Sequence, residues 1–157
     1  MNEHDQEVVR KFVERARAES TAGLMATYRV SGGAPGDSVD EQVDVGGDET
    51  ARVRVRDEVA RGRSGDAESA LAHGETRELY RVLGDALPDM MSREEARFLP
   101  DALVGSVTID VDGDATTLFF DADRDDLRPR GSEVSPALTE AVERIERLTG
   151  ELLRGVD

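Results

Sequence analysis

The chain contains no cysteine, and this absence excludes disulfide frameworks, zinc–thiolate sites and thiol nucleophiles together. Histidine is scarce: His4 and His73 are the only two, and no second imidazole stands at ligand spacing to either one. No apolar run approaches the ~20 residues that a membrane-spanning helix needs. Residues 1–19 are charged throughout, so no secretory signal is expected there. We therefore expect a soluble, cytoplasmic protein.

Lysine is almost missing as well. Lys11 is the only lysine among 20 basic residues, which are outnumbered by 35 acidic ones to give a net charge of −15. A field of this sign repels nucleic-acid phosphates and anionic lipids, so neither nucleic acid nor membrane is predicted as a partner. Three interpretations remain: a halophile-type surface, an acidic binder of a basic protein, and a nucleic-acid mimic. The acids are spread along the whole chain, which favours the halophile-type surface.

At 157 residues the chain is most simply one domain. A domain of this size can bury roughly 68–70% of its unfolded surface, so it needs no metal or disulfide to fold. Apolar residues from Val9 to Ala16 recur at helical spacing and predict an amphipathic helix from Asp5 to Glu19. We expect this helix, within residues 1–22, to be an extension that precedes a single domain over residues 25–157.

From Met25 onwards the spacing of apolar residues changes to two, which predicts a three-stranded meander with one apolar face. The third strand alternates Val53 and Val55 with outward-facing arginines. Residues 57–74 are small and polar, and they predict a long loop that could include a short fourth strand near Ala70 to Ala72.

The second half of the chain continues with a helix from Glu75 to Leu87, which Pro88 is expected to close. Residues 92–95 have the form of a capping box and predict a short helix. A hairpin over residues 107–120 and a final helix that starts at Ser135-Pro136 complete the chain. This order predicts an α+β fold, with an antiparallel sheet of about five strands and helices packed on one face.

A glycine-rich run between the first two strands resembles a phosphate-binding loop at first sight. Such a loop must lead into a helix, whose N-terminal amides hold the anion. Here the glycines lead into an alternating strand rich in carboxylates, and no lysine of the Walker type follows. The run is therefore interpreted as the tip of a β-hairpin, with Pro35 stiffening the connection.

Carboxylate clusters are the other candidates for chemistry. Residues 110–121 place acids at several positions of a calcium loop, but Ala115 stands where that loop requires glycine, and the flanks are strands. Residues 121–126 interleave acids with arginine, as a solvated loop does. His73 has no nucleophile-elbow sequence to complete a triad. We therefore expect no catalytic residue, no metal site and no cofactor, and hence a protein that is not an enzyme.

One resemblance adds to these inferences. The first strand ends in Ser-Gly-Gly at residues 31–33, and Gly36 follows three residues later. After this motif come a meander, a helix near Leu79, a hairpin around Ile109 and a final helix near Leu138. In this pattern the chain resembles the emfourin-like proteins, a family related to protein inhibitors of thermolysin-type metalloproteases.

The resemblance covers residues 25–153 and implies an inhibitor or regulatory binder of a partner protein. It also implies that the glycine hairpin is the contact element, which consists of Ser31, Gly32, Gly33, Ala34, Pro35, Gly36 and Asp37. A different hypothesis is an assembly module that oligomerises through the N-terminal helix. A third hypothesis is an enzyme that uses the carboxylates of residues 121–126.

Overall fold

The computed structural model describes the chain in seven stretches, which are residues 3–18, 21–32, 39–57, 64–71, 73–91, 103–122 and 136–154. Within these stretches three helices and six strands occur in the order α-β-β-β-β-α-β-β-α. Their bounds are α1 Glu3–Arg17, β1 Leu24–Gly32, β2 Val39–Gly46, β3 Thr50–Asp57, β4 Ser64–Ala70, α2 His73–Met91, β5 Leu103–Val111, β6 Asp114–Ala122 and α3 Pro136–Arg154. The predicted α+β class is confirmed, with six strands rather than about five.

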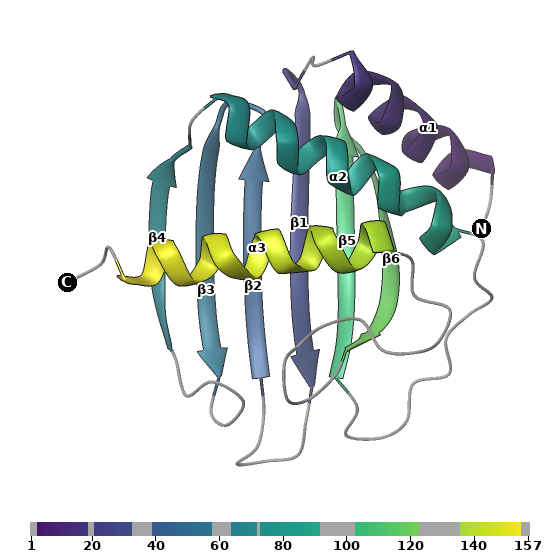
Figure 1. Cartoon of the computed structure of the whole chain (residues 1–157). Coiled ribbons are helices and arrows are strands. Elements are labelled where there is room, and N and C mark those ends of the chain that lie inside the picture. The colour runs from purple at the N-terminus through teal and green to yellow at the C-terminus, as the bar shows by residue number, and fades with distance from the viewer. Residues whose placement is uncertain are drawn as a thin grey trace.

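The six strands form one antiparallel sheet in the order β4-β3-β2-β1-β5-β6 (Figure 1). β1 to β4 make a meander, in which each strand pairs with the next one in sequence. α2 then carries the chain back across the sheet, and β5 pairs with the remaining side of β1. β6 follows β5 in a hairpin, so that β4 and β6 are the two edge strands.

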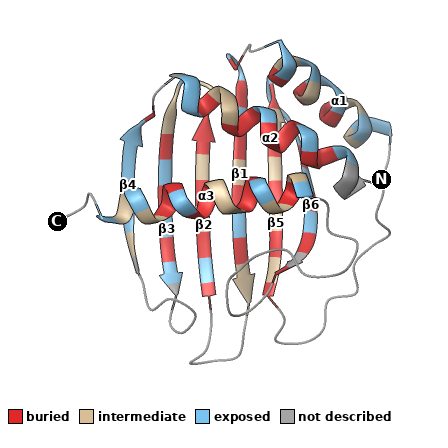
Figure 2. Cartoon of the chain, in the orientation of Figure 1, coloured by how far each residue is buried: buried red, intermediate tan, exposed pale blue. Residues whose placement is uncertain are grey.

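The helices lie over one face of this sheet. α2 and α3 cross it, and α1 packs beside α2 above β5 and β6 (Figure 1). Alternate strand residues point toward the helices and are buried, as the bands of red along the strands show (Figure 2). Tyr28, Val43 and Val53, for example, stand side by side on neighbouring strands and are each at most 2% exposed. The predicted alternation of apolar and polar residues therefore matches the alternation of buried and solvent-facing residues along these strands.

α1 contributes to the same core as the sheet. Phe12 is fully buried, and its ring centroid lies 5.4 Å from that of Tyr80 on α2. The Tyr80 hydroxyl donates a hydrogen bond to the carbonyl oxygen of Val45 at 2.6 Å, which links α2 to the sheet. At the end of α1, Arg15 forms an ion pair with Asp112 in the β5–β6 turn. The predicted apolar stripe of this helix is thus covered by other parts of the chain.

Two local predictions differ from the structure. A fourth strand occurs, but β4 covers Ser64–Ala70, which we expected to be mostly loop, and not a short stretch near Ala70 to Ala72, because small residues such as Gly65 and Ala67 hide its apolar period. α2 does not end at Pro88 but continues to Met91. Pro88 is exposed, and its missing N–H removes one hydrogen bond from a helix that Leu83 and Leu87 anchor in the core. The capping-box helix predicted at residues 92–95 lies outside the described residues.

Candidate functional site

The helices lie on one side of the sheet (Figure 1), and the face that turns away from them is here called the open face; its described residues are exposed or half-buried. Every second residue of each strand points to it, since successive side chains of a strand alternate. Its strand register places the side chains in rows across the sheet. These rows divide the open face into two halves of different chemistry.

The charged half covers β2, β3 and β4. Arg52 stands between Asp44 on β2 and Glu68 on β4. One row along, Arg54 stands between the neutral Gln42 and the acidic Asp66. Opposite charges on neighbouring strands thus compensate one another, although each exposed pair contributes only about 0–1 kcal/mol. We interpret this half as a solvated ladder of charges.

The neutral half covers β1, β5 and β6. Its uncharged residues are Met25, Thr27, Ser31, Val104, Ser106, Thr108, Ala115, Thr117 and Phe119. Arg29 and Asp110 are charged residues within it, and Asp121 stands at the end of β6. The share of charged residues here is lower than in the whole chain, of which 35% is charged.

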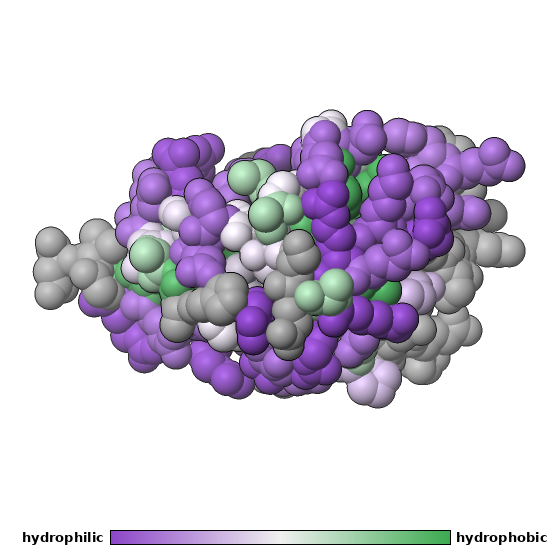
Figure 3. All heavy atoms as spheres, turned by 90° about the horizontal axis from the view of Figure 1, so that it is seen from above, coloured by the Kyte–Doolittle hydropathy of each residue, from purple (hydrophilic) through white to green (hydrophobic). Residues whose placement is uncertain are grey.

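Two large apolar side chains are exposed on the neutral half. Phe119 is 53% exposed and Met25 is 47% exposed, and they are the large hydrophobic residues that stand out on the described surface. Elsewhere, the view from above shows a mainly hydrophilic surface with scattered hydrophobic spots (Figure 3). Within the neutral half, Thr108 on β5 and Thr117 on β6 share a hydrogen bond of 2.7 Å between their side-chain oxygens.

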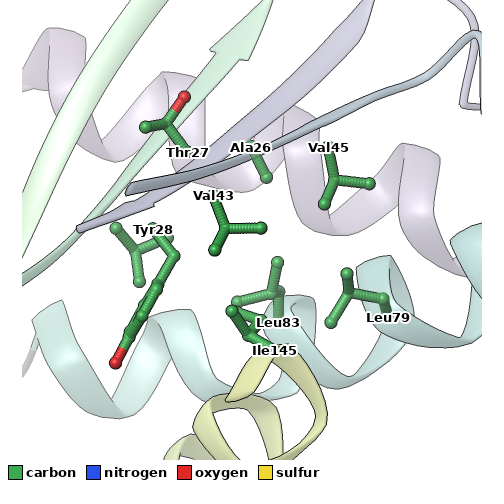
Figure 4. Close-up of a pocket in the computed structure, with 9 residues that line it drawn as sticks. Ala26, Thr27, Tyr28, Val43, Val45, Leu79, Leu83 and Ile145 are labelled. Atoms are coloured by element: carbon green, nitrogen blue, oxygen red, sulfur yellow. The ribbon is translucent and has the colours of Figure 1, made fainter. Parts of the chain in front are cut away.

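The pocket between the sheet and the helices is too small to hold a substrate. This cavity of about 10 Å³ is lined by apolar groups, including Val43, Leu79 and Leu83 (Figure 4). It is about the space of one water molecule, and an apolar cavity of that size stays dry. The Tyr28 hydroxyl points away from the labelled side chains that surround the cavity (Figure 4).

Several polar groups are buried beside this core. The Tyr28 hydroxyl donates a hydrogen bond to Glu146 Oε1 at 3.2 Å, and both residues are buried. Glu41, which the period of two places on the inward face of β2, is fully buried. Burial raises the pKa of Tyr80 well above its ordinary range, and the nearby charge of Asp48 adds to this, so its hydroxyl stays protonated as a donor. Sequence reasoning missed Glu146, although its spacing from Val142 puts it on the buried side of α3.

The predicted contact hairpin lies only in part within the described residues. Ser31 and Gly32 are the last two residues of β1 and pair with Asp40 and Val39. Gly32 has a φ of 134°, a conformation that favours glycine. Residues 33–37 lie outside the described residues. Ser31 belongs to the neutral half, so the base of the hairpin is continuous with that surface.

The other candidate residues within the described stretches lie at the β5–β6 turn and on α1. Asp112 and Gly113 form a two-residue hairpin turn with φ angles of 53° and 97°. Asp110 accepts a hydrogen bond from the backbone N–H of Gly113 at 2.8 Å, and Asp112 pairs with Arg15. His4 is exposed on α1. Across the described stretches, no three His, Asp or Glu residues are grouped so that they could hold a metal ion.

Of the loop carboxylates, only Asp121 falls within a described strand, and residues 123–126 lie outside the described residues.

No helix in the described part of the chain is both long and apolar enough to cross a membrane. A scan against protein-family models found no match, and no curated protein matches the chain significantly. What can be said of function therefore follows from the residues and their geometry.

Proposed function

We propose that the chain is a non-enzymatic protein-binding domain that contacts its partner through the neutral half of the open face. The observation that carries this proposal is the distribution of charge. A chain with a net charge of −15 has one sheet surface on which uncharged residues predominate and which exposes Met25 and Phe119. The centres of protein interfaces are depleted in charged residues and enriched in aromatic residues and methionine.

The size of the whole open face supports a contact that is centred on the neutral half and extends beyond it. Six strands of seven to nine residues, about 4.8 Å apart with about 3.3 Å per residue, give roughly 700–800 Å². A stable interface of standard size buries about 800 Å² on each partner. The neutral half would then supply the apolar centre, with Phe119 as an anchor, and the charged half would supply a polar rim.

A more specific form of the proposal is an emfourin-like inhibitor or regulator of a thermolysin-type metalloprotease. The resemblance of residues 25–153 supports it, and so does the continuity of Ser31 with the neutral half. The hairpin from Ser31 to Asp37 would enter the cleft of the protease. We also propose a cytoplasmic location and a halophile-type surface, which the spread of acids along the sequence supports.

Oligomerisation through the N-terminal helix is a less favoured hypothesis on this geometry. The apolar residues of α1, including Phe12 and Ala16, are buried against the rest of the chain. A second copy would have to displace these contacts before it could use the same stripe.

The test compares two variants that each add one negative charge to the open face. Phe119→Asp changes the neutral half, and Gln42→Asp changes the charged half. A partner is captured at molar salt from an extract of the organism that makes this chain, and each variant is then titrated against it. We expect Phe119→Asp to weaken binding more than tenfold, which is about 1.4 kcal/mol, and Gln42→Asp to change it by less than threefold. Equal affinities for both variants would overturn the proposed surface.

The inhibitor form has its own test. Wild type and the double variant Ala34→Arg, Asp37→Lys are titrated against a purified thermolysin-type protease. Inhibition by wild type that the double variant loses would support the hairpin as the contact element. Absence of inhibition by wild type would remove the inhibitor form and leave the binding surface to the first test.

A further inference from the structure

The outer edge of β4 is the second notable surface of the molecule. Within the described chain β4 pairs with β3 alone. Apart from that ladder, none of the backbone hydrogen bonds between described residues involves residues 65–70. The Ser69 hydroxyl donates a local hydrogen bond of 3.2 Å to the carbonyl oxygen of Ala70. An edge strand of this kind is a template on which another strand can pair.

One backbone hydrogen bond shows which groups of β4 point outward. The N–H of Leu71 donates to the carbonyl oxygen of Glu49 at 2.6 Å, in line with the register of the β3–β4 ladder. In an antiparallel ladder, residue pairs that exchange hydrogen bonds alternate with pairs that do not. Counted back from Leu71, Ala67 is at a bonded position. Asp66 and Glu68 therefore direct their N–H and C=O groups away from β3, toward the outer edge.

The same two residues carry the charges of this edge. The side chains of Asp66 and Glu68 are exposed on the open face, whereas Ala67 between them is buried on the helix side and is 8% exposed. A strand that bonds to the outward backbone groups places its own side chains directly opposite these two carboxylates. The backbone thus offers the hydrogen bonds, and the carboxylates select the residues that can face them.

These carboxylates exclude a second copy of β4 as the occupant. Consider two β4 strands whose outward groups meet in antiparallel fashion across the centre of the strand. Each such register opposes Asp66 with Glu68 of the second copy, or opposes one of these residues with its own copy. Like charges directly opposite each other are destabilising. An acidic strand of any other protein is excluded for the same reason.

We propose that the outer edge of β4 binds an extended basic segment of another protein as an added antiparallel strand. In this pairing arginine or lysine stands opposite Asp66 and Glu68, and an apolar residue stands opposite Ala67. This proposal goes beyond the proposed function, because it concerns a different part of the sheet and a different partner chemistry. The net charge of −15 would also attract a basic segment over longer distances.

The helix side of the edge fits the apolar position of this pattern. The C-terminal end of α3 reaches β4 (Figure 1), and Leu153 lies close to Gly65 there. Leu152 and Leu153 are only half-buried. An apolar residue opposite Ala67 would face the same side of the sheet and extend this apolar contact. The edge therefore favours a segment in which basic and apolar residues alternate.

The chain itself contains a strand with this pattern, which supplies a probe. Residues 50–56 of β3 read Thr-Ala-Arg-Val-Arg-Val-Arg, and on the inner edge of β4 Arg52 and Arg54 stand opposite Glu68 and Asp66. A synthetic peptide of this sequence with blocked ends can place arginine opposite both carboxylates on the outer edge as well. Because a basic peptide is attracted to any part of an acidic chain, the controls must separate strand pairing from general attraction.

The first experiment reverses charges in two places. The labelled peptide is titrated against wild type and two double variants of equal net charge, at the lowest KCl concentration at which circular dichroism shows all three folded. One double variant is Asp66→Lys with Glu68→Lys. The control is Glu3→Lys with Glu14→Lys on α1, which packs over β5 and β6 at the far side of the sheet.

We expect wild type and the α1 control to bind the peptide with dissociation constants within threefold of each other. The β4 variant should bind it more than tenfold more weakly, which is about 1.4 kcal/mol. It should instead bind a counterpart peptide, with glutamate in place of each arginine, more tightly than wild type does. No binding by wild type would overturn the proposal, as would equal losses in the two double variants.

The second experiment tests the backbone pairing and requires no protein variant. In the proposed register the N–H of each arginine of the peptide points to β4, whereas the N–H of each valine points away. We expect N-methylation of the central arginine to weaken binding to wild type more than tenfold, and N-methylation of the valine before it to change binding by less than threefold. Equal affinities of the two methylated peptides would show that charge alone holds the peptide, and would overturn the added strand.

Discussion

The rings of Phe12 and Tyr80 lie 5.4 Å apart between α1 and α2, and both side chains are fully buried. The first helix is therefore joined to the rest of the molecule by a core contact rather than by a surface one. Truncation of a buried phenylalanine to alanine costs about 3–5 kcal/mol. We expect Phe12→Ala to lower the free energy of unfolding by that amount in urea titrations.

Val13→Ala is the matched control on the same helix, because Val13 is only partly buried. Its effect should be clearly smaller. If Phe12→Ala cost no more than Val13→Ala, then α1 would be an attachment to a domain that is stable without it, and deletion of residues 1–22 would leave the remaining chain folded.

The turn between β2 and β3 holds a glycine that has no space for a side chain. A Cβ atom on Gly47 would lie 1.8 Å from the carbonyl oxygen of Thr21, which is a backbone atom and cannot move aside easily. Gly47→Ala should therefore destabilise the fold by about 2 kcal/mol or more, as overpacked sites do. Thermal unfolding followed by circular dichroism would measure this.

Gly74 in the first turn of α2 provides the comparison, because a Cβ atom there meets nothing within 4 Å. Alanine favours the helix over glycine by up to about 1 kcal/mol. Gly74→Ala should leave stability unchanged or raise it slightly. Similar losses for both alanine variants would contradict the close approach of Thr21 to Gly47.

Salt should stabilise the folded chain. With 35 acids against 20 basic residues, unscreened repulsion opposes compaction, and dissolved ions weaken that repulsion. We expect Tm to rise steadily from low salt to multimolar KCl. An unchanged or lower Tm in concentrated KCl would rule out a halophile-type surface and return attention to a basic partner or a nucleic-acid mimic.

An ion-pair cluster on the helix surface gives a prediction about pH. A hydrogen bond from Arg81, together with the charges of Arg81 and Arg144, holds the pKa of Glu78 below its ordinary value. A lowered pKa means that the folded state prefers the ionised carboxylate, so the stabilisation is present above the ordinary pKa and is lost as pH falls through the folded one. The effect is small, because water reaches all three of these side chains and screens their charges.

Comparison of wild type with Glu78→Gln across acidic pH measures this effect. Wild type should have the slightly higher Tm at neutral pH, and the two curves should converge below the ordinary pKa of glutamate. A gap that is constant at every pH would show that the difference arises from packing or helix propensity and not from the charge of Glu78.

Much of the fold could be predicted from the sequence because apolar and polar residues alternate clearly in most strands. Valines at 43, 45, 53 and 55 fix both the period and the inward face of β2 and β3. β4 gave no such signal, since Gly65 and Ala67 are too small to mark a face. Its position depends on pairing with β3, and the residues of β4 alone do not reveal that pairing.

The neutral half of the open face could not be predicted from the sequence for the same reason. Thr27, Ser106 and Thr117 are unremarkable within their own strands, and they become a surface only when β5 inserts between β1 and β6. Sequence reasoning concentrated instead on the glycine hairpin, because a local motif can be seen in one dimension. A surface made of single residues from separate strands requires the strand order.

The placement of β1 at the centre of the sheet also sets an order for folding. On one side β1 pairs with β2, which follows it directly, while on the other side Met25 pairs with Asp110 from the far half of the chain. Local hairpins form quickly, whereas closing a long loop is entropically costly and slows the transition. The β1–β4 meander and the β5–β6 hairpin should therefore form early and separately. Their joining along β1, while α2 spans the distance between them, is the step that we expect to limit the folding rate.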